Sequence, residues 1–142
     1  MAQARTDGQG GPRGPAQRPL SPHLQVWRWH VTMATSILHR GAVIALYIGA
    51  LILAGLFVAL ASGEDAYADY TALLGSPPGL LVLFGLTAAL IYMALYTIRQ
   101  LFWDFGVGFD IKTANLTSWL TIIGAAVLSV AVWGAAFLCG VL

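Results

Sequence analysis

Charged residues are scarce in this chain, making up 9% of its 142 residues against 58% for hydrophobic residues. A soluble globular domain has about 25% charged residues, so this composition excludes an ordinary soluble protein and indicates an integral membrane protein. Three stretches, 41–63, 70–98 and 113–142, contain no Asp, Glu, Lys or Arg. Each provides the roughly 20 residues with which a helix crosses the hydrocarbon core. The sequence therefore predicts an all-α membrane protein with three transmembrane helices.

Cysteine is almost absent, as are the motifs of soluble enzymes. The one cysteine, Cys139, lies in the last apolar stretch, which excludes an internal disulfide and a cysteine-only metal site. Residues 1–17 are rich in Gly, Pro and Gln and lack the apolar segment of a secretory signal peptide, so we expect a disordered tail there and a membrane domain over 18–142. The sequence shows no phosphate-binding glycine loop, no paired carboxylates in a plausible site and no nucleophile elbow.

Basic residues are missing from the connection that follows the first apolar stretch. That connection carries only acidic charges, whereas five arginines precede the stretch and two basic residues flank the next connection. The acidic residues are Glu64, Asp65 and Asp69, and the basic ones are Arg5, Arg13, Arg18, Arg28, Arg40, Arg99 and Lys112. Because positive charge favours the inner side of a membrane, the amino terminus is expected inside and the carboxyl terminus outside.

The three spans are predicted at about 35–61, 78–103 and 117–141. Ser76-Pro77-Pro78-Gly79 precedes the second span and predicts a turn followed by a helix start, because proline is tolerated in the first helical turn. Small residues in the first and third spans would let neighbouring helices approach closely.

A polar corner is predicted where the first span begins. In a helix, Ser36 and Arg40 are four residues apart and share one face, with His39 beside them. A hydroxyl, an imidazole and a guanidinium suit a partly apolar ligand with carbonyl oxygens or carboxylates, such as a quinone or heme propionates. Alternatively, Arg40 only extends to the lipid headgroups as a positive anchor.

Three motifs resemble those of the cytochrome b subunits of succinate dehydrogenase, respiratory complex II. They are "RPLSPHLQVW" (18–27), "SILHR" (36–40) at the mouth of the first span, and "IRQLFWD" (98–104) at the end of the second. The resemblance extends by motif over 18 to about 110, and by its three-span topology over the remainder. It implies a membrane-anchor subunit that passes electrons from an iron–sulfur subunit to ubiquinone.

The resemblance also implies partners and residue roles. The partners would be a second small membrane subunit, an iron–sulfur subunit and a flavoprotein, with no nucleic acid, in a bacterial inner membrane or, alternatively, a mitochondrial one. Ser36 and Arg40 would bind the quinone, and His39, Arg40 and Arg99 would meet heme propionates. The segment from Arg18 to His23 would lie against the iron–sulfur subunit.

The second span departs from the family pattern, His-x-x-x-Gly-x-Arg-His-x-x-x-Asp. Here Met93 stands at the position of the histidine that binds heme b, Thr97 at the glycine and Gln100 at the second histidine. A thioether can act as an axial heme ligand, so Met93 is a candidate, but a methionine in an apolar helix is also an ordinary packing residue. A purely structural, heme-free anchor of the same complex therefore remains an alternative. A small transporter subunit is a further alternative, although the spans lack the ionisable core residue that such a protein uses.

Overall fold

The computed structural model describes residues 28–140, which form four helices. They are α1 (Val31–Ser62), α2 (Glu64–Gly75), α3 (Pro77–Asp104) and α4 (Ile111–Leu138). Helices α1, α3 and α4 are each long and apolar enough to cross a membrane, with mean hydropathies of 2.7, 2.1 and 2.1 over their most apolar stretches. This confirms the predicted all-helical fold with three candidate spans. The predicted tail 1–17, the segment from Arg18 to His23 and the end of the third span at 141 lie outside the described residues.

The helix ends follow local sequence chemistry. Gly63 separates α1 from α2. Its φ angle is 123°, a backbone conformation that residues with a side chain rarely adopt. At the start of α3, Ser76 is the N-cap and its hydroxyl accepts a hydrogen bond from the Gly79 N–H at 3.4 Å. Asp110 caps α4 in the same way through the Lys112 N–H at 3.2 Å. The Ser-Pro-Pro-Gly helix start predicted from the sequence is thus confirmed.

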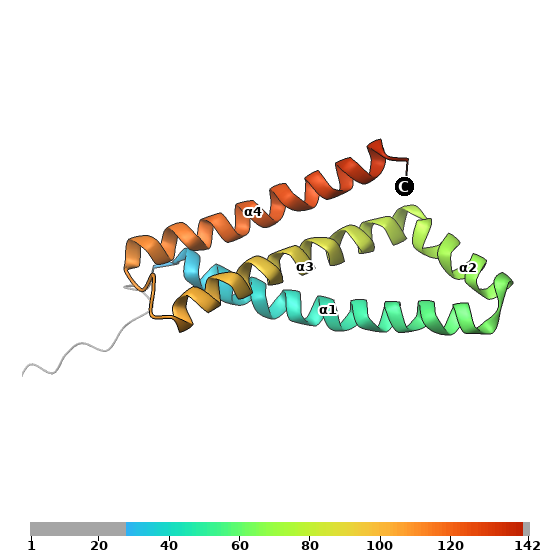
Figure 1. The fold of residues 1–142 in the computed structure, drawn as a ribbon, viewed down its shortest axis with the longest axis horizontal. Helices are drawn as coiled ribbons and strands as arrows, with labels where there is room; N and C mark the ends of the chain where they lie inside the picture. Colours follow the sequence, from blue (N-terminus) through green and yellow to red (C-terminus); the bar gives the residue numbers. More distant parts are fainter. Residues whose placement is uncertain (1–27, 141–142) are drawn as a thin grey trace, which may run out of the picture.

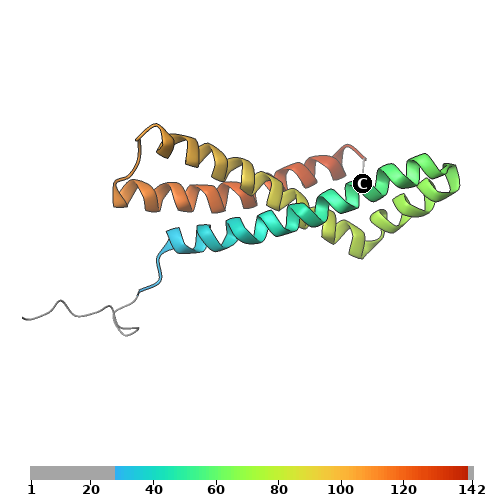
Figure 2. The same ribbon diagram turned by 90° about the horizontal axis from the view of Figure 1, so that it is seen from below.

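The long helices run side by side along an elongated molecule, and α3 crosses obliquely between α1 and α4 (Figures 1 and 2). Ala42, Tyr92 and Ala125, one from each long helix, form the core where the three meet. Helix α2 folds back at the far end and contacts both α1 and α3. The sequence analysis treated this segment as a connection and did not predict α2.

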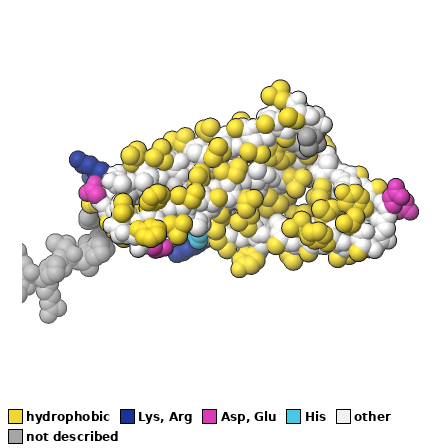
Figure 3. Space-filling model, viewed as in Figure 1, with side chains coloured by type: hydrophobic (Ala, Val, Ile, Leu, Met, Phe, Trp, Pro, Cys, Tyr) yellow, Lys and Arg dark blue, Asp and Glu magenta, His cyan; other side chains and the backbone are white. Residues whose placement is uncertain are grey.

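The bundle buries several polar side chains and exposes many large apolar ones. Apolar side chains are spread over the whole length of the face shown in Figure 3. The fully buried side chains, by contrast, include Thr35, Ser118 and Ser129. Each of the three donates its hydroxyl to a backbone carbonyl three or four residues earlier in its own helix, so no hydroxyl is left unsatisfied. This pattern suits a protein surrounded by lipid, where outward-facing apolar residues carry no cost.

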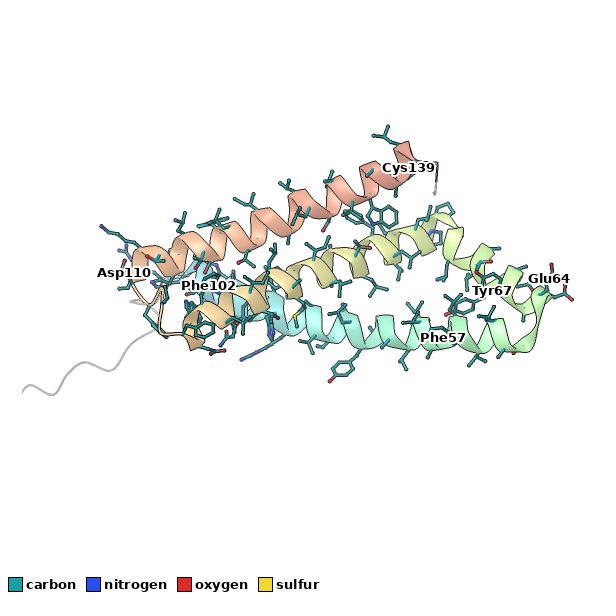
Figure 4. All side chains as sticks on the ribbon, in the orientation of Figure 1. Phe57, Glu64, Tyr67, Phe102, Asp110 and Cys139 are labelled. Carbon is teal, nitrogen blue, oxygen red and sulfur yellow. The ribbon has the colours of Figure 1, made fainter. Side chains whose placement is uncertain are left out.

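Charge is distributed unequally between the two ends of the molecule. We call the end where α1 begins, α3 ends and α4 begins the basic end, because the basic residues of the described chain, Arg28, Arg40, Arg99 and Lys112, lie toward it. In the view of Figure 3, the basic and histidine side chains gather toward this end. Acidic side chains occur at both ends, and at the opposite tip they are the only charged side chains in view. Figure 4 labels Phe102 and Asp110 at the basic end and Glu64 at the opposite one.

Candidate functional site

Aromatic side chains of α3 hold the start of α1 in place at the basic end. The Tyr92 hydroxyl donates to the backbone carbonyl of Thr35 at 2.7 Å. One turn further along α3, the Tyr96 ring lies against the His39 ring, with centroids 4.3 Å apart and planes tilted by 31°. The Tyr92 and Tyr96 rings are themselves 6.0 Å apart. Two successive turns of α3 therefore contact two successive turns of α1, which fixes the rotation of α1 about its own axis.

That rotation leaves Ser36 and Arg40 on an exposed face of α1. Both side chains are exposed, and neither forms a hydrogen bond or ion pair with any residue of the described range 28–140. His39, half-buried against Tyr96, borders this face. We call the surface formed by Ser36, His39 and Arg40 the α1 polar face. It combines a hydroxyl, an imidazole and a guanidinium, all of which can donate hydrogen bonds to the oxygens of a ligand.

Arg99 lies in a different environment from the α1 polar face. Its side chain is 6% exposed. Nε donates to the Thr117 hydroxyl at 3.1 Å and Nη2 to the Ala114 carbonyl at 3.4 Å, both on α4. The guanidinium carbon also lies 4.0 Å from the centre of the Trp103 ring, a cation–π contact.

Arg99 lines a groove of about 380 Å³ between α3, the following loop and α4. None of the lining residues in the described chain comes from α1. The structure thus brings Ser36, His39 and Arg40 together on one helix but places Arg99 on a separate surface. The three residues that the resemblance assigns to heme propionates, His39, Arg40 and Arg99, therefore lie on two surfaces of the described chain.

Met93 packs against the protein's own core. It is half-buried and contacts the cluster formed by Ala42, Tyr92 and Ala125. One turn toward the basic end, the rings of Tyr96 and His39 lie against each other between α3 and α1. The residues present therefore do not fit a heme held between α1 and α3 with Met93 as its axial ligand. We derive no step through a heme, and axial ligation by Met93 stays a sequence-based prediction that this packing argues against.

Sequence reasoning missed the groups that position the site, above all Tyr92, Tyr96 and Trp103. One signal was available, because Tyr92 and Tyr96 are four residues apart on α3, as Thr35 and His39 are on α1. Matching spacings are compatible with two helices in contact. They do not specify which turn of one helix meets which turn of the other.

Comparison with known proteins finds one kind of relative, the membrane subunits of succinate dehydrogenase or fumarate reductase. Residues 15–132 match the family described as "Succinate dehydrogenase/Fumarate reductase transmembrane subunit". The "Succinate dehydrogenase cytochrome b556 subunit" of Rickettsia bellii is 36% identical over 118 residues, covering 82% of this chain and 91% of that protein. The subunit of the same name from Paracoccus denitrificans is 38% identical over 113 residues, covering 80% and 87%. The mitochondrial "Succinate dehydrogenase cytochrome b560 subunit" of Mus musculus is 38% identical over 118 residues, covering 81% and 67%.

Proposed function

Because the chain belongs to the family of succinate dehydrogenase/fumarate reductase transmembrane subunits, we propose that its α1 polar face lines the site where the complex reduces ubiquinone. The chain is a membrane-anchor cytochrome b subunit of such a complex, so other subunits of the complex accompany it. The oxidation of succinate belongs to a flavoprotein subunit, and the electrons reach this membrane face through an iron–sulfur subunit. A second small membrane subunit completes the anchor.

One observation carries the proposal: Ser36 and Arg40 lie one turn apart on an exposed face at the basic end, without partners among the described residues. A quinone carbonyl oxygen can accept hydrogen bonds from both a hydroxyl and a guanidinium. Reduction to the quinol consumes two electrons and two protons, and negative charge develops on the oxygens as the electrons arrive. A fixed cation in a water-poor setting stabilises that charge strongly.

His39 is suited to hold or pass a proton at this face. An imidazole can donate through one ring nitrogen while accepting at the other. The His39 ring is held against Tyr96, which fixes its position. Arg40 is the next residue along the helix. We therefore assign quinone binding to Ser36 and Arg40, and proton handling at the same oxygens to His39.

The orientation in the membrane follows from the same proposal. The basic end faces the cytoplasm of a bacterium, where the iron–sulfur subunit docks on it, and the carboxyl terminus faces outward. The relatives include both bacterial and mitochondrial proteins. In a mitochondrion the basic end would face the matrix.

A heme-free variant of this function is a second candidate, and the packing of Met93 favours it. The relatives are named cytochrome b556 and b560 subunits. In this chain, however, the side chain at the family's histidine position packs against Ala42, Tyr92 and Ala125. Under this candidate the chain keeps the anchor and the quinone face but supplies no axial ligand from α3.

Substitution of Arg40 tests the proposal. In the complete complex, Arg40→Ala should lower the rate of succinate-dependent ubiquinone reduction by about a hundredfold, the scale of losing one group that stabilises a developing oxyanion. Succinate oxidation with a soluble artificial acceptor should continue at the wild-type rate. Lys112→Ala removes another exposed positive charge from the same end and serves as the matched control, with both rates unchanged. A wild-type quinone rate in Arg40→Ala would refute the assignment.

A further inference from the structure

The Arg99 groove holds a buried cation that no carboxylate neutralises within the described chain. Arg99 is 6% exposed, and its hydrogen-bond acceptors are the neutral oxygens of Thr117 and Ala114. Among residues 28–140 it forms no ion pair. Removing a guanidinium from water without a counter-charge is costly, and buried charges are generally paired. The charge of Arg99 is therefore left to be neutralised by an anion from outside the described residues.

Donor groups remain available to bind that anion. An arginine side chain has five N–H groups, of which two donate to Thr117 and Ala114 and three have no acceptor in the described residues. Nη1 has no hydrogen-bond partner among the described residues, yet no buried side-chain nitrogen there is unpartnered, so Nη1 keeps some accessible surface. Arg99 lines the groove. The Trp103 indole N–H, on the same groove, also has no acceptor among residues 28–140.

The remaining wall of the groove is apolar and faces outward. Ile98, Phe102 and Leu120 line it and are 51%, 58% and 60% exposed. Arg99 lies five residues before Asp104, the last residue of α3, which corresponds to about 7.5 Å along the helix. A cation at this distance from a helix end, beside a tryptophan, is at the depth where lipid headgroups meet acyl chains.

We propose that the Arg99 groove binds an anionic phospholipid, with its phosphate on the free Arg99 N–H groups and an acyl chain along Ile98, Phe102 and Leu120. A phospholipid supplies in one molecule the negative charge, the acceptor oxygens and the apolar chain that the groove matches. This assignment is independent of quinone reduction, because the groove contains no residue of the α1 polar face.

Native mass spectrometry of the purified complex tests the proposal. The delipidated complex is titrated with phosphatidylglycerol and, separately, with zwitterionic phosphatidylcholine of the same chain length. We expect phosphatidylglycerol to bind about tenfold more tightly to the wild type, and Arg99→Gln to abolish that preference, since a charged hydrogen-bonding partner is lost. An equal affinity of the wild type for both lipids, or an unchanged preference in Arg99→Gln, would overturn it.

A second pair of variants leaves Arg99 in place. Leu120→Trp fills the apolar wall and should weaken phosphatidylglycerol binding about tenfold, whereas Ile123→Trp, on the next turn of α4 and 54% exposed, should leave it unchanged. If the complex does not assemble with Arg99→Gln, the two tryptophan variants still test whether the groove binds phosphatidylglycerol. Equal lipid affinities in the two tryptophan variants would contradict the proposal, as would a partner subunit cross-linked at Leu120 in the intact complex.

Discussion

Tyr96 is a single residue with two consequences for the site. Its ring lies against His39 and so fixes the direction of Ser36 and Arg40 on the adjacent, exposed side of α1. The same ring occupies the space between α1 and α3 next to Met93. A residue that orients the α1 polar face thus also argues against a heme bound by Met93 between these two helices.

Met93→Leu is expected to leave the optical spectrum and the thermal stability of the complex nearly unchanged. Leucine has a similar volume and keeps the contacts with Ala42, Tyr92 and Ala125, so the free energy of unfolding should fall by less than about 1.5 kcal/mol. The measurement is a reduced-minus-oxidised difference spectrum of the purified complex, together with a melting curve. A displaced or lost heme band in this variant would instead make Met93 an axial ligand.

Helix α2 shows how an element that does not cross the membrane stabilises one that does. The Tyr70 hydroxyl donates to the Ile52 carbonyl of α1 at 2.8 Å. Gly55 makes this approach possible, because a Cβ at that position would lie 2.6 Å from the Tyr70 hydroxyl oxygen. The close approach of α2 to α1 at Tyr70 therefore uses one hydrogen bond and one missing side chain.

Gly55→Ala should loosen α2 without unfolding the spans. The new methyl group displaces the Tyr70 hydroxyl and removes a hydrogen bond worth about 1 kcal/mol, so the α2 amides should exchange hydrogen about fivefold faster. Gly85→Ala is the control, since a Cβ there meets nothing within 4 Å. Hydrogen–deuterium exchange of the two variants in detergent measures the difference. Equal α2 exchange rates would show that Tyr70 does not hold this helix.

The elements were largely predictable from the sequence, but their contacts were not. Uncharged stretches revealed the three long helices, and Ser76 with the following prolines revealed where α3 begins. The α2 segment was missed because acidic residues at its start read as a loop, although Glu64 and Asp65 also suit the first turn of a helix. Motifs identified Arg40 and Arg99 as candidates. That they face different surfaces depends on how α3 is rotated between α1 and α4, which no local pattern encodes.

The whole molecule has a basic end and an acidic tip, and this asymmetry predicts its orientation. In a Cys139→Ser background, we expect Asp65→Cys to react with a membrane-impermeant maleimide in intact bacterial cells. Lys112→Cys should react only after the membrane is permeabilised, because positive charge is retained inside. Both positions are exposed and flank the spans at opposite ends, so each serves as the control for the other. The reverse labelling pattern would invert the assigned topology.

The most direct test of the α1 polar face is photolabelling of the purified complex with a photoreactive ubiquinone analogue, followed by peptide mapping. We predict that the label falls on this chain between Ser36 and Arg40 and that excess ubiquinone suppresses it. Label that is suppressed by ubiquinone but maps only to α4 or to other subunits would contradict the account.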